Sequence, residues 1–244
     1  MIRFKAWSGD LGCRKIADAF NRRHAIARRM TVSKSYVAYV LKTSRSEVLH
    51  LRRTLKHRVP RELPRNRVWA LDLSTVTGLT RKQRLVLGVV DYGTRACLRL
   101  AELADKRSLT ILVELIAAFR RFGLPRTIRT DNEPCFVSRT MKLALGLLGV
   151  RMQRTDVHCP WQNGRIERLF GTFKAALAKI MVVDSGDLRV KLIEFRAWYN
   201  HARPHQHLAM RTPVEAWSGH KRATGKPRWL RVWDGELTGW YFPP

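Results

Sequence analysis

Three acidic residues lie where the sequence predicts buried strands and an amphipathic helix. Asp72 interrupts the apolar run 68–76, and Asp131 ends the short strand-like stretch 127–131. Glu167 lies about one turn inside a helix that is expected to begin at Asn163 and Gly164. Carboxylates that converge from separate rigid elements could hold Mg²⁺, a hard cation that prefers oxygen ligands. Two such ions, about 3.5–4 Å apart, can hold the attacking and leaving oxygens of a phosphoryl transfer.

Taken singly, each acid has an ordinary structural explanation, as a solvent-facing residue of a strand or helix. The stretches around them are Trp-Ala-Leu-Asp, Thr-Asp-Asn-Glu-Pro-Cys-Phe and Pro-Trp-Gln-Asn-Gly-Arg-Ile-Glu-Arg, and 35 residues separate the second acid from the third. In this order and with this gap, the motifs resemble the three acids of DDE transposases and retroviral integrases. The similarity is greatest to transposases of bacterial insertion sequences with an integrase-type core, and it covers roughly residues 63–217.

The resemblance implies a catalytic and metal-binding set made of Asp72, Asp131 and Glu167, holding two Mg²⁺ or Mn²⁺ ions. Two other acids compete for these roles. Asp91 ends a predicted strand just before Gly93, which favours a turn residue, and Glu133 follows two residues after Asp131. In the pattern of the family, the position of Glu133 is not the catalytic acid.

The loop 156–162 and the helix after it are predicted to meet DNA beside the metals. In that interpretation Gln162, Asn163 and Arg165 contact the substrate at the start of the helix. Arg168 and Lys174 contact phosphates further along, and Lys174 lies on nearly the same side as Glu167, two turns away. The alternative for both cations is a solvated helix face.

The pattern from residue 68 onward predicts an α/β fold. Strands are expected at 68–76, 85–91, 97–101, 127–131 and 151–155, with helices at 109–121 and 139–148 before the one that carries Glu167. Three antiparallel strands followed by alternating helices and strands is the order of a ribonuclease H-like, mixed five-stranded sheet with flanking helices. The resemblance implies the same fold, in a catalytic core at 63–217.

Residues 1–62 are strongly basic and are predicted to form a small helical region. A helix over 32–41 begins at a serine cap, so two helices with the second one basic suggest a helix-turn-helix. In that interpretation Ser33, Lys34, Ser35 and Tyr36 face the major groove of DNA. The alternative is a helical bundle that binds phosphates without sequence preference.

The C-terminal part contains a predicted helix over 188–201, then Tyr-Asn-x-x-Arg-Pro-His and Thr-Pro-x-x-Ala stretches that resemble the end of the same transposase cores. His201, His205 and His207 lie close together in sequence, but a proline interrupts them, which favours packing over metal binding. The tail 218–244 has apolar and aromatic residues on both sides of Asp234-Gly235-Glu236, which predicts a small hairpin.

Composition limits the class of protein. The 244 residues carry 47 Lys and Arg against 19 Asp and Glu, a net charge of +28, and such an excess favours a nucleic-acid partner. Neither a signal peptide nor a membrane-spanning run is evident, so we expect a cytoplasmic, nucleoid-associated protein that does not act at a membrane. Four scattered cysteines without Cys-x-x-Cys spacing indicate reduced thiols.

Together these features predict an enzyme, a DDE transposase that binds the DNA ends of a mobile element and catalyses metal-dependent cleavage and strand transfer. Its partners would be element ends and target DNA, a second copy of the chain, and a second transposase subunit if this chain is one part of a larger machine. Two alternatives remain open: an inactive or truncated DNA-binding relative, and a nuclease on the same fold.

Overall fold

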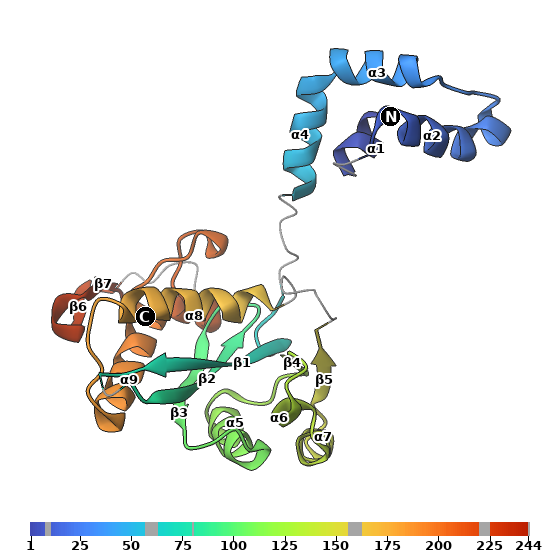
Figure 1. Ribbon diagram of the computed structural model, residues 1–244. Coiled ribbons are helices and arrows are strands. Elements are labelled where there is room, and N and C mark those ends of the chain that lie inside the picture. The colour runs from blue at the N-terminus through green and yellow to red at the C-terminus, as the bar shows by residue number, and fades with distance from the viewer. Residues whose placement is uncertain (8–10, 57–62, 80, 156–162, 220–224, 244) are drawn as a thin grey trace. The chain divides into compact units, whose positions relative to one another are not determined.

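The computed structural model describes residues 1–244 except 8–10, 57–62, 80, 156–162, 220–224 and 244. The chain divides into two compact units, residues 1–61 and 62–244, and each is described by itself (Figure 1).

The N-terminal unit is a small helical domain with its own core. Ile16, Ala17 and Val37 are buried in its centre. The Asn21 side chain donates to Val32 O and accepts from Val32 N, and these bonds fix the connection between the second and third helices. Ser33 caps the third helix by accepting from Tyr36 N, as its sequence predicts. The helices are α1 (Ile2–Trp7), α2 (Cys13–Arg28), α3 (Lys34–Thr43) and α4 (Arg45–Lys56).

The larger unit is built on a mixed five-stranded sheet. Its strand order is β3-β2-β1-β4-β5. The pairs β1/β2 and β2/β3 are antiparallel, whereas β1/β4 and β4/β5 are parallel. This arrangement confirms the predicted sheet. The strands are β1 (Val68–Thr77), β2 (Gln83–Asp91), β3 (Cys97–Leu103), β4 (Thr127–Thr130) and β5 (Arg151–Arg154).

Helices cover both faces of this sheet, because its strands carry apolar side chains on both sides. Alternate residues of β1 divide between two cores: Trp69 and Leu71 pack with α5 (Ser108–Phe122), α6 (Pro134–Val137) and α7 (Arg139–Leu147). Val68 and Ala70 pack with α8 (Gly164–Leu177) and α9 (Ser185–His201) (Figure 1). In the described part of the chain no helix is long and apolar enough to cross a membrane.

Ser108 differs from the sequence expectation at the start of α5. A serine directly before the helix predicted at 109–121 is a typical N-cap, but Ser108 is itself the first helical residue, and the N-cap position belongs to Arg107. The Ser108 hydroxyl instead donates to Cys135 O at 2.7 Å and lies 2.7 Å from the Ser138 hydroxyl. A long-range partner has taken the side chain that would otherwise cap the helix.

The C-terminal residues form part of the same core. The hairpin β6 (Arg228–Val232) and β7 (Leu237–Tyr241) confirms the predicted hairpin, and the short η3 (Trp233–Gly235) joins its strands. Trp233 is 4% exposed and its ring contacts Phe195 and Phe173 at centroid distances of 5.9 and 6.4 Å. Before the hairpin, η2 (Gln206–Leu208) and α10 (Pro213–Ser218) follow α9. A capping box between Thr212 and Glu215 begins α10.

Trp233→Ala tests how strongly the hairpin stabilises the core. Removal of a buried tryptophan should lower the free energy of unfolding by about 3–5 kcal/mol, through lost apolar contact and the cavity left behind. Urea denaturation measures this change, with Trp229→Ala as the control because Trp229 is 55% exposed on the same hairpin. Equal losses in the two variants would contradict a structural role specific to Trp233.

Candidate active site

Asp72 and Asp131 come from neighbouring parallel strands. The register of β1 and β4 pairs Val68 with Thr127 and Ala70 with Arg129. Continued by two residues, the same register brings Asp72 opposite Asp131, at the end of β4. Successive side chains of a strand point to opposite faces of the sheet. Ile128 packs into the core on the far side from α8, so Asp131, three residues later, faces α8. Asp72 faces α8 as well, because it alternates with Ala70 of the core that includes this helix. The sheet therefore brings these two acids together on one face.

Glu167 approaches the same face because α8 packs closely on β2. Gly88 is the partner of Asp72 in the β1/β2 register. A Cβ atom at Gly88 would lie 2.8 Å from Cζ of Phe170 and 3.0 Å from Cδ1 of Ile166, so only glycine leaves room for these two side chains. Glu167 lies directly beside Ile166 on the helix, and its own side chain is exposed.

The start of α8 is also tied to β1. Asn163 precedes the helix, and its Nδ2 donates to Leu71 O at 3.4 Å, one residue before Asp72. The sequence predicts Asn163 as a DNA contact and a helix cap, but its side chain is 5% exposed and makes no capping hydrogen bond. The helix begins after Asn163, as the sequence predicts, but the amide ties the helix to the strand and does not cap it. A DNA contact by Asn163 stays a prediction.

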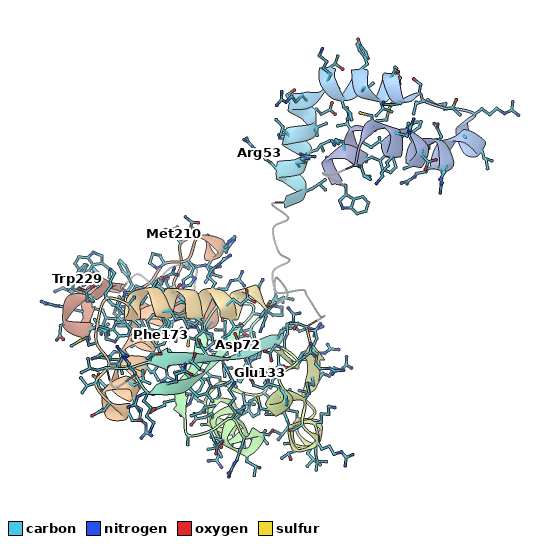
Figure 2. All side chains as sticks on the ribbon, in the orientation of Figure 1. Arg53, Asp72, Glu133, Phe173, Met210 and Trp229 are labelled. Atoms are coloured by element: carbon cyan, nitrogen blue, oxygen red, sulfur yellow. The ribbon has the colours of Figure 1, made fainter. Side chains whose placement is uncertain are left out.

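The pKa of Asp72 depends on its burial and on the acids around it. Burial raises the pKa of the Asp72 carboxyl, to about 7, and the hydrogen bond from Leu73 N–H opposes this change. The negative charges of Asp131, Glu133 and Glu167 raise the pKa further. Figure 2 shows Asp72 on β1 and Glu133 before α6 at the same end of the sheet.

Asp131 is partly buried at the end of its strand. Burial also raises the pKa of its carboxyl. Its Oδ1 accepts from Glu133 N at 3.0 Å, just as Oδ1 of Asp72 accepts from Leu73 N at 2.8 Å. Among the described residues, no hydrogen bond involves Oδ2 of either aspartate. One oxygen on each carboxylate is therefore available to a ligand.

The rival acids have other partners. Asp91 is fully buried, and its Oδ1 accepts from the amide and the hydroxyl of Thr94, both at 2.8 Å. Its Oδ2 accepts from Asn66 N, so Asp91 is a turn residue, as the glycine two positions later suggests. Glu133 lies 3.6 Å from Nζ of Lys106 in an ion pair.

The donor set suits a hard divalent cation. Carboxylate oxygens are the ligands that Mg²⁺ prefers, and a cation would relieve the repulsion that raises the pKa of Asp72. Within the described residues, no three His, Cys, Asp or Glu side chains are grouped closely enough to hold a metal as they stand. The three acids offer the oxygen atoms that such a cation prefers, and they lie toward one face of the sheet. Their assignment as metal ligands stays a prediction.

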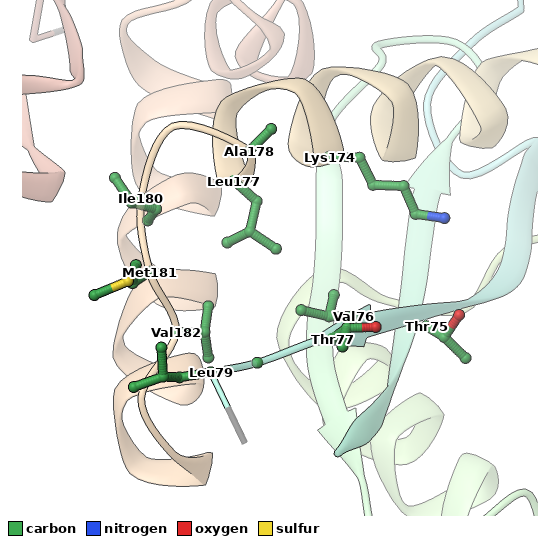
Figure 3. A pocket seen from close by; sticks show the side chains of 11 residues that line it. Thr75, Val76, Thr77, Leu79, Lys174, Leu177, Ala178, Ile180, Met181 and Val182 are labelled. Carbon is green, nitrogen blue, oxygen red and sulfur yellow. The ribbon is translucent and has the colours of Figure 1, made fainter. Parts of the chain in front are cut away.

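The other predicted DNA contacts differ in exposure. Arg165 is half-buried, and its guanidinium lies 4.2 Å from the centroid of the Tyr92 ring. Arg168 and Lys174 are exposed on α8. Lys174 lines one end of a cavity of about 360 Å³ between α8 and the end of β1, opposite Ile180 (Figure 3). Gln162 lies outside the described residues. Lys34, Ser35 and Tyr36 are exposed at the start of α3, in the other unit.

Sequence reasoning missed Gly88 and the group around Tyr92. Arg129 lies 4.6 Å from the centroid of the same ring on which Arg165 stacks, so two cations hold one aromatic side chain beside α8. An isolated glycine inside an apolar strand is a signal of close approach, and it could have identified Gly88. Nothing in the sequence pairs Tyr92 with either arginine.

Sequence comparisons find integrase-type and insertion-element proteins among those similar to this chain. The family described as Integrase core domain matches residues 148–213. An uncharacterized protein of insertion element IS407 from Burkholderia multivorans is 28% identical over 164 residues, 66% of this chain. The Pol polyprotein of Radiation murine leukemia virus is 37% identical over 62 residues, 25% of this chain. The chain spans 59% of the first protein and 11% of the second.

Solved structures show the same fold. The magnesium complex of the HTLV-2 integrase catalytic core domain has a TM-score of 0.53 at 17% identity, over 64% of this chain and 99% of that one. A chain of the simian T-cell lymphotropic virus intasome in complex with PP2A regulatory subunit B56 gamma has a TM-score of 0.57 at 18% identity, over 100% of this chain and 87% of that one. These matches confirm the ribonuclease H-like fold. Together with the sequence matches above, they confirm the resemblance to insertion-sequence transposases and retroviral integrase cores.

Gly88→Ala tests the packing that brings Glu167 to the aspartates. The new methyl group must displace the Phe170 ring, which should lower the free energy of unfolding by about 1–3 kcal/mol. If the proposed activity is present, it should fall more steeply than stability, because α8 moves away from β1. Urea denaturation and DNA cleavage measure the two effects. Gly146→Ala on α7 is the control, since a Cβ atom there meets nothing within 4 Å. Full activity in Gly88→Ala would contradict a positioning role.

The raised pKa of Asp72 predicts a pH dependence of stability. In the metal-free protein the folded state holds this proton more tightly than the unfolded state, so stability should fall as the pH rises from about 4 to about 7. The loss should be on the order of 2–4 kcal/mol. Asp72→Asn should flatten this part of the profile and be more stable than the wild type at pH 8. Urea denaturation with a chelator measures both proteins, and parallel profiles would contradict the prediction.

Proposed function

We propose that this integrase-type chain is a transposase that binds the DNA ends of a mobile element and catalyses phosphodiester cleavage followed by strand transfer. The observation that carries the proposal is the approach of Asp72, Asp131 and Glu167 to one face of an integrase-core sheet. The acids come from two strands and a helix that pack rigidly, which suits a reaction dependent on positioning.

The proposed metal ligands are Asp72, Asp131 and Glu167. Two bound Mg²⁺ or Mn²⁺ ions would supply charge neutralisation at the phosphate and activation of the attacking oxygen. Magnesium appears in the name of one structural neighbour, the HTLV-2 integrase core. The protein's contribution is to hold the carboxylates in place: the backbone amides after Asp72 and Asp131 fix their Oδ1 atoms, and α8 brings Glu167 to them.

In the proposed reaction, water first attacks the phosphodiester at the end of the element, and the 3′ oxygen leaves as a free hydroxyl. That hydroxyl then attacks a phosphodiester of the target, and a second 3′ hydroxyl departs. Arg168 and Lys174, exposed on the helix that carries Glu167, would bind phosphates of the substrate. Since no covalent intermediate with the protein is required, catalysis rests on orientation and electrostatics.

The N-terminal unit would add DNA binding. Lys34, Ser35 and Tyr36 are exposed at the first turn of α3, and the bonds between Asn21 and Val32 fix how this helix follows α2. We propose that α3 enters the major groove as the second helix of a helix-turn-helix. Two element ends must be cut together, so the active form would be an oligomer on DNA, with a second transposase subunit as a further candidate partner. Such a substrate would place the protein at the bacterial nucleoid.

Glu167→Gln tests the function directly. The purified chain with Mg²⁺ or Mn²⁺ should release and join labelled DNA carrying the ends that flank its own gene, and the variant should lose at least about a hundredfold in rate because one metal ligand is removed. Glu194→Gln, on α9 of the same unit, is the control. Cleavage without joining would identify a nuclease instead, and tight binding with neither reaction would identify an inactive DNA-binding relative.

A further inference from the structure

Two tryptophans stand exposed beside a cavity at the C-terminal hairpin. Trp229 and Trp240 face each other across β6 and β7, with ring centroids 4.9 Å apart, and are 55% and 53% exposed. They line a cavity of about 690 Å³, together with Met210 and Phe242. Figure 2 shows Trp229 and Met210 toward one end of the unit. Such a volume is typical of ligand sites, and the aromatic surfaces are open to a flat partner.

A cluster of cations adjoins this cavity. Arg203 lines it, and its Nη1 lies 3.1 Å from Nε2 of His205. The ring of His205 contacts that of Tyr199 at 5.0 Å, and the Arg203 guanidinium lies over the same tyrosine at 5.6 Å. Burial lowers the pKa of His205, to about 3, and the charges of Arg203, Arg95 and Arg168 lower it further. Arg203 therefore lies next to a neutral histidine.

One carboxylate also lines the cavity, that of buried Glu215, whose Oε2 accepts from Thr212 N. None of the ion pairs formed by described residues includes Arg95, Arg168 or Arg203. The hairpin adds Arg228 and Arg231 on either side of Trp229 and Leu230. Aromatic side chains next to unpaired arginines are the combination that binds single-stranded nucleic acid, by stacking on bases and pairing with phosphates.

One of these arginines, Arg168, is the sequence neighbour of a candidate catalytic acid. Arg168 directly follows Glu167 on α8, and it lies near enough to His205 to affect the histidine electrostatically. The Arg168 charge therefore lies on the helix that carries Glu167, and Arg203 lies at the cavity. A second copy of this chain is a poor occupant, because it carries the same net charge of +28. An uncharged apolar peptide would leave the arginines without a partner.

We propose that the cavity binds an unpaired nucleotide of the DNA strand that leaves the candidate active site. Its base stacks on Trp229 or Trp240, and Arg203 and Arg168 bind the phosphates beside it. The inference rests on the proposed function, since it takes DNA as the substrate, and it adds a contact for single-stranded ends at a place separate from the acids.

Fluorescence anisotropy tests the proposal with two labelled probes, a blunt duplex and the same duplex with a short single-stranded overhang. The full chain should bind the overhang more tightly. The double variant Trp229→Ala, Trp240→Ala should lose about tenfold in affinity for the overhang and leave the blunt duplex unchanged. The double variant with phenylalanine at both positions should keep the preference, because phenylalanine still stacks. Trp7→Ala, at a tryptophan that is 82% exposed in the other unit, is the matched control.

Arg203→Gln should weaken overhang binding and reduce its dependence on salt by about one phosphate contact. An unchanged overhang preference in the alanine double variant would overturn the proposal. An equal loss for both probes would do the same, and so would a change in self-association without a change in DNA binding.

A second measurement needs no variant. Photo-crosslinking of a 5-bromouracil placed in the overhang should label residues 226–242 of the unmodified chain, and labelling found only elsewhere would overturn the proposal. These experiments distinguish a failure of the nucleotide-site proposal from a failure of the transposase proposal. Overhang binding that depends on the tryptophans, in a protein without cleavage activity, supports the nucleotide site and counts against the transposase. Cleavage with no overhang preference does the reverse.

Discussion

The close packing of α8 on the sheet is the constraint on which the rest of the site depends. Gly88 lets Ile166 and Phe170 lie directly against β2, and the Asn163 side chain ties the start of the helix to β1. Without this approach Glu167 would be one exposed glutamate on a basic helix. With it, a residue 36 positions beyond Asp131 reaches the face on which both aspartates lie.

The electrostatic consequence is a concentration of negative charge in a strongly basic chain. Burial and the neighbouring acids raise the pKa of Asp72, so the metal-free arrangement costs folding energy. This cost is the expected property of a site built to hold cations, since a bound divalent ion would remove the repulsion. Near the start of α8, the guanidinium groups of Arg165 and Arg129 both lie over the ring of Tyr92.

The opposite end of α8 depends on aromatic packing. Phe173 on α8 contacts Phe195 on α9, and Phe195 contacts Trp233 of the C-terminal hairpin. One continuous core therefore joins the helix that carries Glu167 to the last residues of the chain. The Trp198 indole donates to Thr238 O at 2.8 Å and fixes the second strand of the hairpin. The tail is accordingly a structural part of the larger unit, and its two exposed tryptophans are held in a defined place.

The sequence by itself determined the strands, most helices and the three candidate acids, because hydrophobic periodicity and local motifs are properties of neighbouring residues. It also determined the serine cap of α3 and the turn role of Asp91, which depend on contacts a few positions apart. Only the tertiary structure decided that Asn163 is buried against Leu71 O, that Ser108 bonds to Cys135 O, and that Trp233 joins the main core. Each of these side chains had a plausible local role, and a partner 27 or more residues away took its place. Local patterns cannot reveal such partners, because burial and pairing are fixed only when distant segments pack together.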